Sequence, residues 1–287
     1  MHYDTLDQFI ADGKDVLANG PIALIFAEDP VEVVSTLSHH LNLGFGAVIL
    51  FAPDEIGVPA ETAAQIHRVR VNTTGPDVVP STVNRLIDEA SGTWMFFCYN
   101  GEYLFFPFCE TRTIRDLVTF HAEERRNAML TYVVDLYAGD LATAPSGVDP
   151  SDAYLDKSGY YALGRSGDDG RSKERQLDFH GGLRWRFEEH VPPARRRIDR
   201  ISIFRAKKGL RLLDNRVFND EEYNTYACPW HHNLTAAVGS FRTAKALKAN
   251  AGSTYDIPTF RWHNSTPFQW NSQQLMDLGL METGQWF

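Results

Sequence analysis

The chain of 287 residues is long enough to bury a full core, and its 43% hydrophobic and 23% charged residues are typical of a folded globular protein. A formal net charge of -9 argues against a general nucleic-acid binder, because neutralising phosphates requires a basic face. Three cysteines are too few for a disulfide framework, and no apolar run reaches membrane-spanning length. These totals predict a cytoplasmic protein without an integral membrane segment.

The N-terminal part of the chain alternates between helical and strand-like patterns. A helical pattern over residues 5–18 comes first, and "PIALIF" (21–26) and "AVILF" (47–51) are short apolar runs of the buried-strand type. Between these two strands, Pro30 is expected at the first position of a helix that Asp29 caps. The spacing of the apolar residues that follow predicts that this helix buries one face.

The same alternation continues toward the middle of the chain. A crossover helix over 80–91 leads to a third strand, "TWMFFC" (93–98), and a further helix and strand are expected over 113–126 and 128–138. Strands that alternate with helices at short spacing imply a parallel sheet whose strands are joined by right-handed crossovers. The predicted fold class is therefore α/β, with a mostly parallel central sheet flanked by helices.

The pattern changes near residue 140. The segments 141–152 and 163–175 are polar and rich in glycine and serine, which predicts mobile loops. The remaining elements are expected to be two short strands and one helix, over residues 183–187, 200–206 and 241–251. The chain closes with an aromatic-rich extension, and the second half is expected to pack on the first rather than fold alone.

The stretch "WMFFCYNGEYLFFP" (94–107) interrupts an apolar run with polar residues. A buried strand that arrives at a sheet edge, turns there and continues as an extended segment would produce this pattern. Ligands of α/β sheets bind outside the carboxyl ends of strands, so Asn100 and Glu102 are candidate site residues. An ordinary turn is the alternative interpretation.

Several segments resemble one family of enzymes. They are "SHHLNLGFGAVILF", "TWMFFCYNGEYLFFP", "TYVVDLY" and "HGGLRWRF", with weaker similarity in "RISIFR" and "VGSFRTAKAL". The order of elements and these segments resemble GT-A glycosyltransferases, specifically glycosyltransferase family 2. The resemblance implies a Rossmann-like GT-A fold with a nucleotide-sugar-binding half over 1–140 and an acceptor-binding, closing half over 141–287. It also implies a nucleotide-sugar donor and a glycan or other hydroxyl acceptor.

The resemblance fails at the residues that bind metal in that family. Most GT-A enzymes hold a divalent ion with an Asp-x-Asp motif at this strand end, where the charge of the leaving diphosphate develops. Here the two positions are Tyr99 and Gly101, and only Glu102 stays in register. The family's Leu-His-Phe-Lys segment, whose His could complete the metal site, reads "GSFR" in residues 239–242.

A metal-independent transferase without a cofactor is the first hypothesis that follows. The family's "GGxR" segment matches residues 181–184, so Arg184, Arg186 and Arg242 are the expected cations that hold the diphosphate. Either Glu102 or Asp135 would deprotonate the acceptor hydroxyl, since an inverting transfer needs one well-placed base.

Two further hypotheses remain open. In one, Asn100 and Glu102 hold a weakly bound Mn²⁺ or Mg²⁺ by themselves. In the other, the fold is kept but the chemistry is lost, which leaves a catalytically inactive module that binds a glycan or a protein.

Other candidate residues follow from their places in the chain. Glu28 follows the first strand, where GT-A proteins bind the nucleobase or ribose, and Asp54 follows the second strand, where relatives carry an Asp-Asn-x-Ser pattern. His180 precedes two glycines, where backbone can approach a ligand closely. The segment 164–173 is expected to serve as a lid over the donor.

The segment "CPWHHN" (228–233) carries Cys and His residues, which are the ligands that zinc prefers. It lacks the four suitably spaced ligands of a closed site, so acceptor binding by sugar-stacking aromatic rings is the second interpretation. The residues of that interpretation are Trp230, His231, His232, Trp262 and Trp270. For at least two of the three tryptophans, packing in an aromatic core is expected.

Overall fold

The computed structural model describes residues 1–167, 169–227 and 233–286. The chain divides into two compact units, each assembled from separate segments. Unit 1 comprises Met1–Leu104, Thr111–Leu130 and Ile201–Asn224, and unit 2 comprises Phe105–Glu110, Thr131–Arg200 and Thr225–Phe287. The chain thus returns to unit 1 late in the sequence. The functional halves expected over 1–140 and 141–287 remain a prediction.

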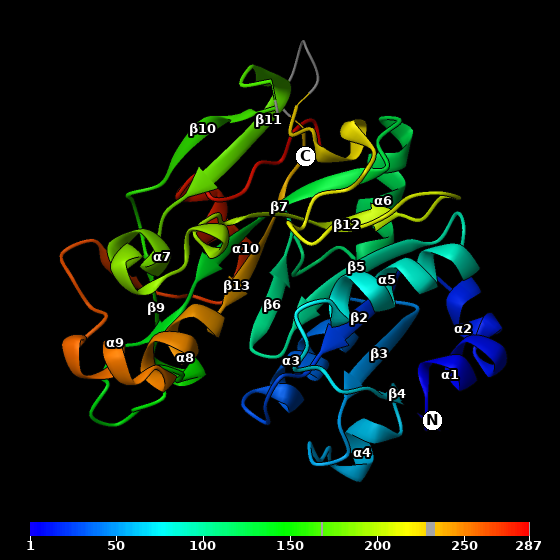
Figure 1. Cartoon of the computed structure of the whole chain (residues 1–287), viewed down its shortest axis with the longest axis horizontal. Coiled ribbons are helices and arrows are strands. Elements are labelled where there is room, and N and C mark those ends of the chain that lie inside the picture. The colour runs from blue at the N-terminus through cyan, green and yellow to red at the C-terminus, as the bar shows by residue number, and fades with distance from the viewer. Residues whose placement is uncertain (168, 228–232, 287) are drawn as a thin grey trace. The chain divides into compact units, whose positions relative to one another are not determined.

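Unit 1 has a mostly parallel sheet (Figure 1). The strand order is β1 (His2–Tyr3), β4 (His67–Arg70), β3 (Ala47–Ala52), β2 (Ile22–Phe26), β5 (Trp94–Tyr99) and β12 (Asp199–Arg205). Neighbouring strands pair in parallel from β1 to β5, and β12 pairs with β5 in antiparallel fashion. The α/β class with a mostly parallel sheet flanked by helices is therefore confirmed.

The helices of unit 1 follow the predicted alternation. They are α1 (Leu6–Asp12), α2 (Lys14–Ala18), α3 (Val33–Asn42), α4 (Ala60–Ala63), α5 (Val78–Glu89) and α6 (Ile114–Glu123). Helices α1 and α2 pack against α5, and α3 packs on β3. Strands β2 and β5 are buried along their whole length, as expected for parallel strands covered on both faces.

The start of α3 differs from the sequence-based expectation. The helix begins at Val33 rather than Pro30, and its N-cap is Glu32, with a left-handed φ of 57°, rather than Asp29. The carboxylate of Asp29 instead accepts a hydrogen bond of 2.9 Å from the backbone N–H of Val31. This local turn holds the segment out of the helix. The sequence patterns also missed β1, α4 and β4, which are too short to show periodicity.

The described part of unit 2 combines two strands of the nine-stranded sheet with two smaller sheets and short helices. Strands β7 (Ala128–Asp135) and β13 (Ala236–Ser240) are parallel; β8 (Tyr137–Ala138), β9 (Ala153–Asp156) and β14 (Ser265–Pro267) form an antiparallel sheet; β10 (Tyr161–Ser166) and β11 (Ser172–His180) form a hairpin. The helices are α7 (Leu183–Arg186), α8 (Arg242–Ala249), α9 (Ala251–Asp256) and α10 (Ser272–Asp277). The apolar cluster includes Tyr137, Leu183, Leu247 and Phe260.

Two expectations about this part of the chain were wrong. Residues 183–187, expected as a strand, contain the short helix α7, because Gly181 and Gly182 turn the chain with φ values of 156° and 64°. Much of the expected loop 163–175 belongs to the β10–β11 hairpin. An ion pair of 2.7 Å between Arg165 on β10 and Asp178 on β11 joins the two strands of this hairpin. A lid role for 164–173 stays a prediction.

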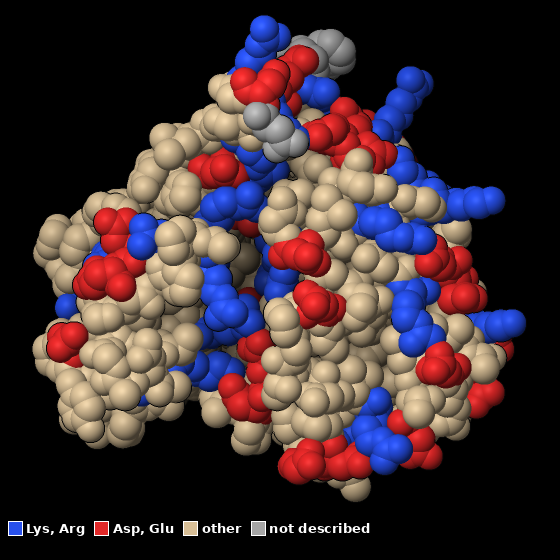
Figure 2. All heavy atoms as spheres, in the orientation of Figure 1, with Lys and Arg blue, Asp and Glu red and all other residues tan. Residues whose placement is uncertain are grey.

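Charged side chains of both signs are interspersed on the face of the molecule that Figure 2 shows. At the surface of unit 1, ion pairs join Arg85 to Asp7, Arg211 to Asp88, and Lys207 to Asp220. Such exposed pairs contribute little to stability. Among the described helices, none combines the length and apolarity needed to span a bilayer.

Candidate functional site

The strand order of unit 1 contains a topological switch point between β2 and β5. From β2 the chain continues to β3 and β4 on one side, whereas β5 pairs with β2 on the other side. Since β2 and β5 are parallel, the loops after Phe26 and Tyr99 leave the same edge of the sheet. Open α/β sheets bind ligands at this kind of place. We take this part of unit 1, called the switch-point edge, as the candidate site.

Asn100 ties together the two loops at the switch-point edge. Its side-chain oxygen accepts a hydrogen bond of 2.9 Å from the backbone N–H of Glu28. Its Nδ2 donates to Asp29 Oδ1 at 2.8 Å and to the carbonyl of Val31 at 2.7 Å. The side chain is fully buried. Asn100 therefore fixes the course of the loop that follows β2.

Glu102 is also engaged within the turn that follows β5. Its side chain is buried, and its carboxylate accepts a hydrogen bond of 2.9 Å from the backbone N–H of Tyr99. Gly101 has a φ of 72°, and its N–H donates to Thr36 Oγ1 at 2.8 Å. The predicted strand, turn and second strand are confirmed, with β6 (Glu102–Phe105) as the second strand. Catalysis by Glu102 remains a prediction.

The oxygens proposed to hold a weakly bound metal ion already accept backbone hydrogen bonds. Within the described ranges, no group of three or more His, Cys, Asp or Glu side chains is arranged to hold a metal ion. Metal binding by these two residues gains no support from their surroundings.

Acidic side chains lie at the ends of β2 and β3. Glu28 and Asp29 follow β2 and are half-buried. Asp54 follows β3, is exposed, and forms an ion pair of 3.2 Å with Arg70. Their predicted place at the carboxyl ends of strands is confirmed, and nucleotide contact by Glu28 and Asp54 remains a prediction.

Arg216 is a residue of this edge that the sequence patterns did not single out. Its guanidinium carbon lies 5.3 Å from the centroid of the Tyr99 ring, at the end of β5. Arg216 belongs to the segment 201–224, which returns to unit 1. The polar stretch "DNR" between apolar residues indicates a turn. No sequence signal places that turn beside β5.

Asp135 and Arg184, both predicted site residues, pair with each other in unit 2. Asp135 ends β7 and is buried, and its carboxylate lies 3.2 Å from Arg184 Nε. Thr243 Oγ1 donates to the same carboxylate at 2.8 Å, and Arg184 also donates to the carbonyl of Arg197 at 2.7 Å. Burial raises the pKa of Asp135, although Arg184 and Thr243 oppose this effect.

Arg186 is held in a second internal cluster of unit 2. Its Nη1 donates to Asp156 Oδ1 at 2.9 Å, and the same oxygen accepts from Tyr137 at 2.5 Å and from Trp262 Nε1 at 2.7 Å. The guanidinium carbon of Arg186 lies 4.8 Å from the Trp262 ring centroid. Arg184 and Arg186 therefore each serve a buried aspartate, and phosphate binding by either remains a prediction.

The other predicted site residues of this half occupy varied places. The His180 ring stacks on Tyr161 with centroids 5.1 Å apart, at the end of β11. Arg242 begins α8, and its backbone N–H donates to Ser240 Oγ at 3.3 Å. The predictions on Cys228, Trp230, His231 and His232 lie outside the described residues.

Unit 2 presents an exposed tryptophan that the sequence analysis did not consider. Trp185, on α7, is 41% exposed, and its ring centroid lies 6.4 Å from that of Trp262. A Cβ on Gly159 would lie 3.3 Å from the Trp185 ring, so the backbone packs closely there. By contrast, Trp270 packs on Phe268 with ring centroids 4.9 Å apart. Of these two neighbouring rings, that of Trp185 is exposed, whereas Trp262 is half-buried with Arg186 over its ring.

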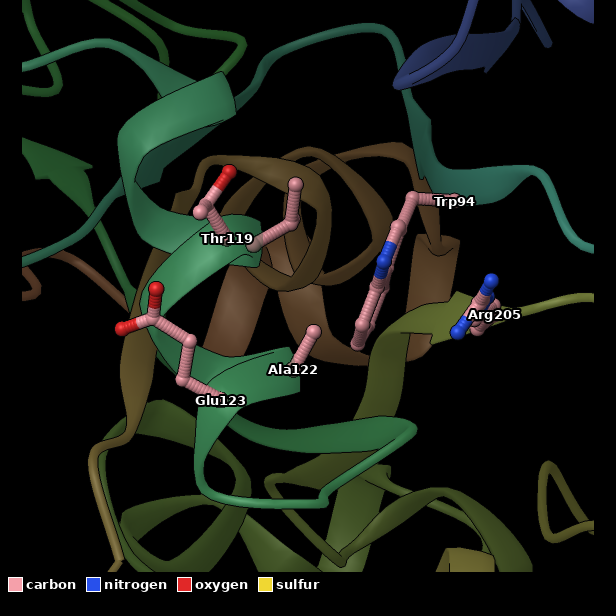
Figure 3. A pocket seen from close by; sticks show the side chains of 6 residues that line it. Trp94, Thr119, Ala122, Glu123 and Arg205 are labelled. Atoms are coloured by element: carbon pink, nitrogen blue, oxygen red, sulfur yellow. The ribbon is translucent and has the colours of Figure 1, made fainter.

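A shallow hollow of about 390 Å³ lies at the other end of β5 (Figure 3). It is lined by Trp94, Val118, Thr119, Ala122, Glu123 and Arg205. Trp94 is the first residue of β5, so this hollow lies at the opposite end of that strand from the switch-point edge. Of the predicted site residues that the structure describes, none lines this hollow.

No protein-family model matches this chain, and no curated protein matches it either.

Proposed function

We propose that the protein is a GT-A-type glycosyltransferase that binds a nucleotide-sugar donor at the switch-point edge and acts without a divalent metal. The observation that carries this proposal is the strand order around β2 and β5, together with the loops that Asn100 joins there. The acceptor is a hydroxyl group of a glycan or a related molecule. The sparse cysteines favour a reducing compartment, and we place the activity in the cytoplasm.

The proposed reaction breaks the bond between the anomeric carbon of the sugar and the diphosphate oxygen. The bonding electron pair stays on the diphosphate, and the acceptor oxygen forms the new bond to the anomeric carbon. The acceptor's proton passes to a carboxylate, for which Glu102 and Asp135 are the proposed candidates. Both accept hydrogen bonds inside their units, so either would have to exchange a partner to act as a base.

Binding of a glycan is supported by the aromatic surface of unit 2. Trp185 is 41% exposed next to Trp262, and flat apolar rings of this kind stack on sugar rings. Asp156 fixes the Trp262 indole through a hydrogen bond of 2.7 Å, so this ring is held in one orientation. We propose that these two rings contact the acceptor.

A second candidate function is supported by the buried predicted residues. Asn100, Glu102 and Asp135 are all buried and hydrogen-bonded within their own units. A protein that keeps these groups only for structure would be a catalytically inactive module that binds a glycan or a protein.

Thermal unfolding with nucleoside diphosphates distinguishes these functions. UDP, GDP, CDP, ADP and dTDP are each added at saturating concentration, with and without Mn²⁺. A ligand that binds only the folded state raises stability by RT ln(1 + [L]/Kd), which is about 2.7 kcal/mol at a hundredfold excess over Kd. We expect at least one nucleotide to raise the unfolding temperature without metal. A shift that requires Mn²⁺ would contradict metal independence, and no shift with any of the five would contradict the transferase proposal.

A further inference from the structure

The hairpin that carries Arg216 is a well-defined turn. Leu212 pairs with Phe218 in a β-bridge, and the N–H of Leu213 donates to the carbonyl of Val217 at 2.8 Å. The N–H of Arg216 donates to the carbonyl of Leu213 at 2.9 Å. Arg216 has a φ of 63°, which residues other than glycine rarely adopt. Such strain persists only where the surrounding structure holds it.

Contacts with the rest of unit 1 hold this hairpin in place. Asn84, on α5, donates to the carbonyl of Leu212 at 2.9 Å and accepts from its N–H at 2.7 Å. The ring of Phe218 packs against Phe204 and Tyr223, with centroids 4.8 and 5.5 Å apart. Hydrogen bonds from Asn84 and the packing of Phe218 therefore hold the two strands of the hairpin that carries Arg216.

The side chain of Arg216 reaches the end of β5. Its guanidinium lies over the ring of Tyr99, which directly precedes Asn100. A cation over an aromatic face is attracted by the ring quadrupole, and the ring orients the planar guanidinium. Because Asn100 joins the loops after β2 and β5, Arg216 lies at the switch-point edge.

Arg216 differs from other arginines of unit 1 because no carboxylate of the described residues pairs with its guanidinium. Arg70, Arg85 and Arg211 each form an ion pair with an aspartate. The guanidinium of Arg216 forms no ion pair and no hydrogen bond with any residue that the structure describes, and the side chain is half-exposed. It thus presents its donors at the edge without a carboxylate to neutralise it.

We infer that Arg216 binds the diphosphate group of a nucleotide held at the switch-point edge. This inference rests on the proposed function and names the group that replaces the metal charge. A guanidinium presents a planar set of N–H donors that matches phosphate oxygens, and it stays charged as the diphosphate leaves. Arg184 and Arg186, two of the three cations expected from the sequence, each pair with a buried aspartate instead.

The inference is tested by calorimetric titration of the intact chain with UDP, GDP, CDP, ADP, dTDP and inorganic pyrophosphate. The variants are Arg216→Ala, Arg216→Lys and, as matched control, Arg85→Ala, which removes another exposed arginine of unit 1. We expect Arg216→Ala to weaken binding of the best nucleotide by roughly tenfold or more, with partial recovery in Arg216→Lys. Arg85→Ala should bind as the unsubstituted protein does, and pyrophosphate should compete with the nucleotide only where Arg216 is present.

The outcomes separate the inference from the proposed function. If a nucleotide binds the unsubstituted protein and Arg216→Ala binds it equally well, the role of Arg216 is wrong and donor binding stands. If no nucleoside diphosphate binds the unsubstituted protein, the proposed function and the inference both fail. Circular dichroism and thermal unfolding of each variant establish that the fold is retained.

Discussion

Replacing Arg184 with Met is expected to lower the free energy of unfolding by about 3–5 kcal/mol at neutral pH, since removing one partner of a buried ion pair leaves an uncompensated charge. Asp135 has a fully buried side chain, and that of Arg184 is 15% exposed. Equilibrium urea unfolding measures the loss as a lower midpoint. The exposed Arg195 offers a matched control, and Arg195→Met should stay within about 0.5 kcal/mol of the unsubstituted protein.

The loss in Arg184→Met should depend on pH in a defined direction. Burial raises the pKa of Asp135 and Arg184 opposes the rise, so removing Arg184 raises the pKa further. Over the interval between the ordinary aspartate pKa, about 3.9, and the raised value, the folded state binds a proton that the unfolded state has released. The stability of the variant therefore falls as the pH rises through this interval.

A second substitution tests whether the carboxylate causes the loss. Asp135→Asn combined with Arg184→Met removes both charges. The double variant should therefore regain most of the lost stability, and its stability should no longer fall as the pH rises through this interval. A single variant that is as stable at pH 7 as at pH 4 would contradict this account of the pair. Equal losses in the single and double variants would assign the effect to packing of Arg184 instead.

Replacing Asn100 with Ala is expected to lower the free energy of unfolding by about 2–4 kcal/mol, because several buried polar groups lose their partners together. The backbone N–H of Glu28 loses its acceptor, and the carbonyl of Val31 loses its donor. The loss of protection should be greatest in the loop that follows β2. Hydrogen exchange of the Glu28 amide should accelerate in the variant more than exchange in the centre of β2.

Two comparisons sharpen the Asn100 prediction. Asn72→Ala removes an exposed side chain whose hydrogen bonds within the described ranges go to Thr74, and it should change stability by less than about 1 kcal/mol. Asn100→Asp keeps an acceptor for the Glu28 amide but loses both N–H donors and places a charge beside Asp29. It should protect the amide yet destabilise the fold at neutral pH. Unchanged amide exchange in Asn100→Ala would contradict the proposed tie between the two loops.

The main sheet of unit 1 follows from sequence patterns because its strands are long apolar runs separated by helices. β2, β3 and β5 lie where "PIALIF", "AVILF" and "TWMFFC" predicted them. The polar residues after β5 also lie at a sheet edge, as predicted. These features depend on local periodicity, which a single sequence contains.

Other parts of the fold could not be predicted from the sequence, because they depend on contacts between residues that lie far apart in the chain. Residues 183–187 favour a strand by composition, but two positive-φ glycines and the partnership of Arg184 with Asp135 produce α7. The sequence predicts Asp135 and Arg184 as site residues, but it does not show that they form an ion pair with each other. Arg216 lies far from Tyr99 in the chain, and only the fold brings its side chain to the end of β5.

The late return of the chain to unit 1 also bears on how the protein emerges from the ribosome. β5 is an entirely buried strand, and the strand that hydrogen-bonds to its outer side in unit 1, β12, is synthesised roughly a hundred residues later. At elongation rates of about 5–20 residues per second, synthesis of this part of the chain takes roughly 5–20 s. During that time a nascent chain carries an uncapped apolar edge, which is the kind of surface that molecular chaperones shield and that aggregation exploits.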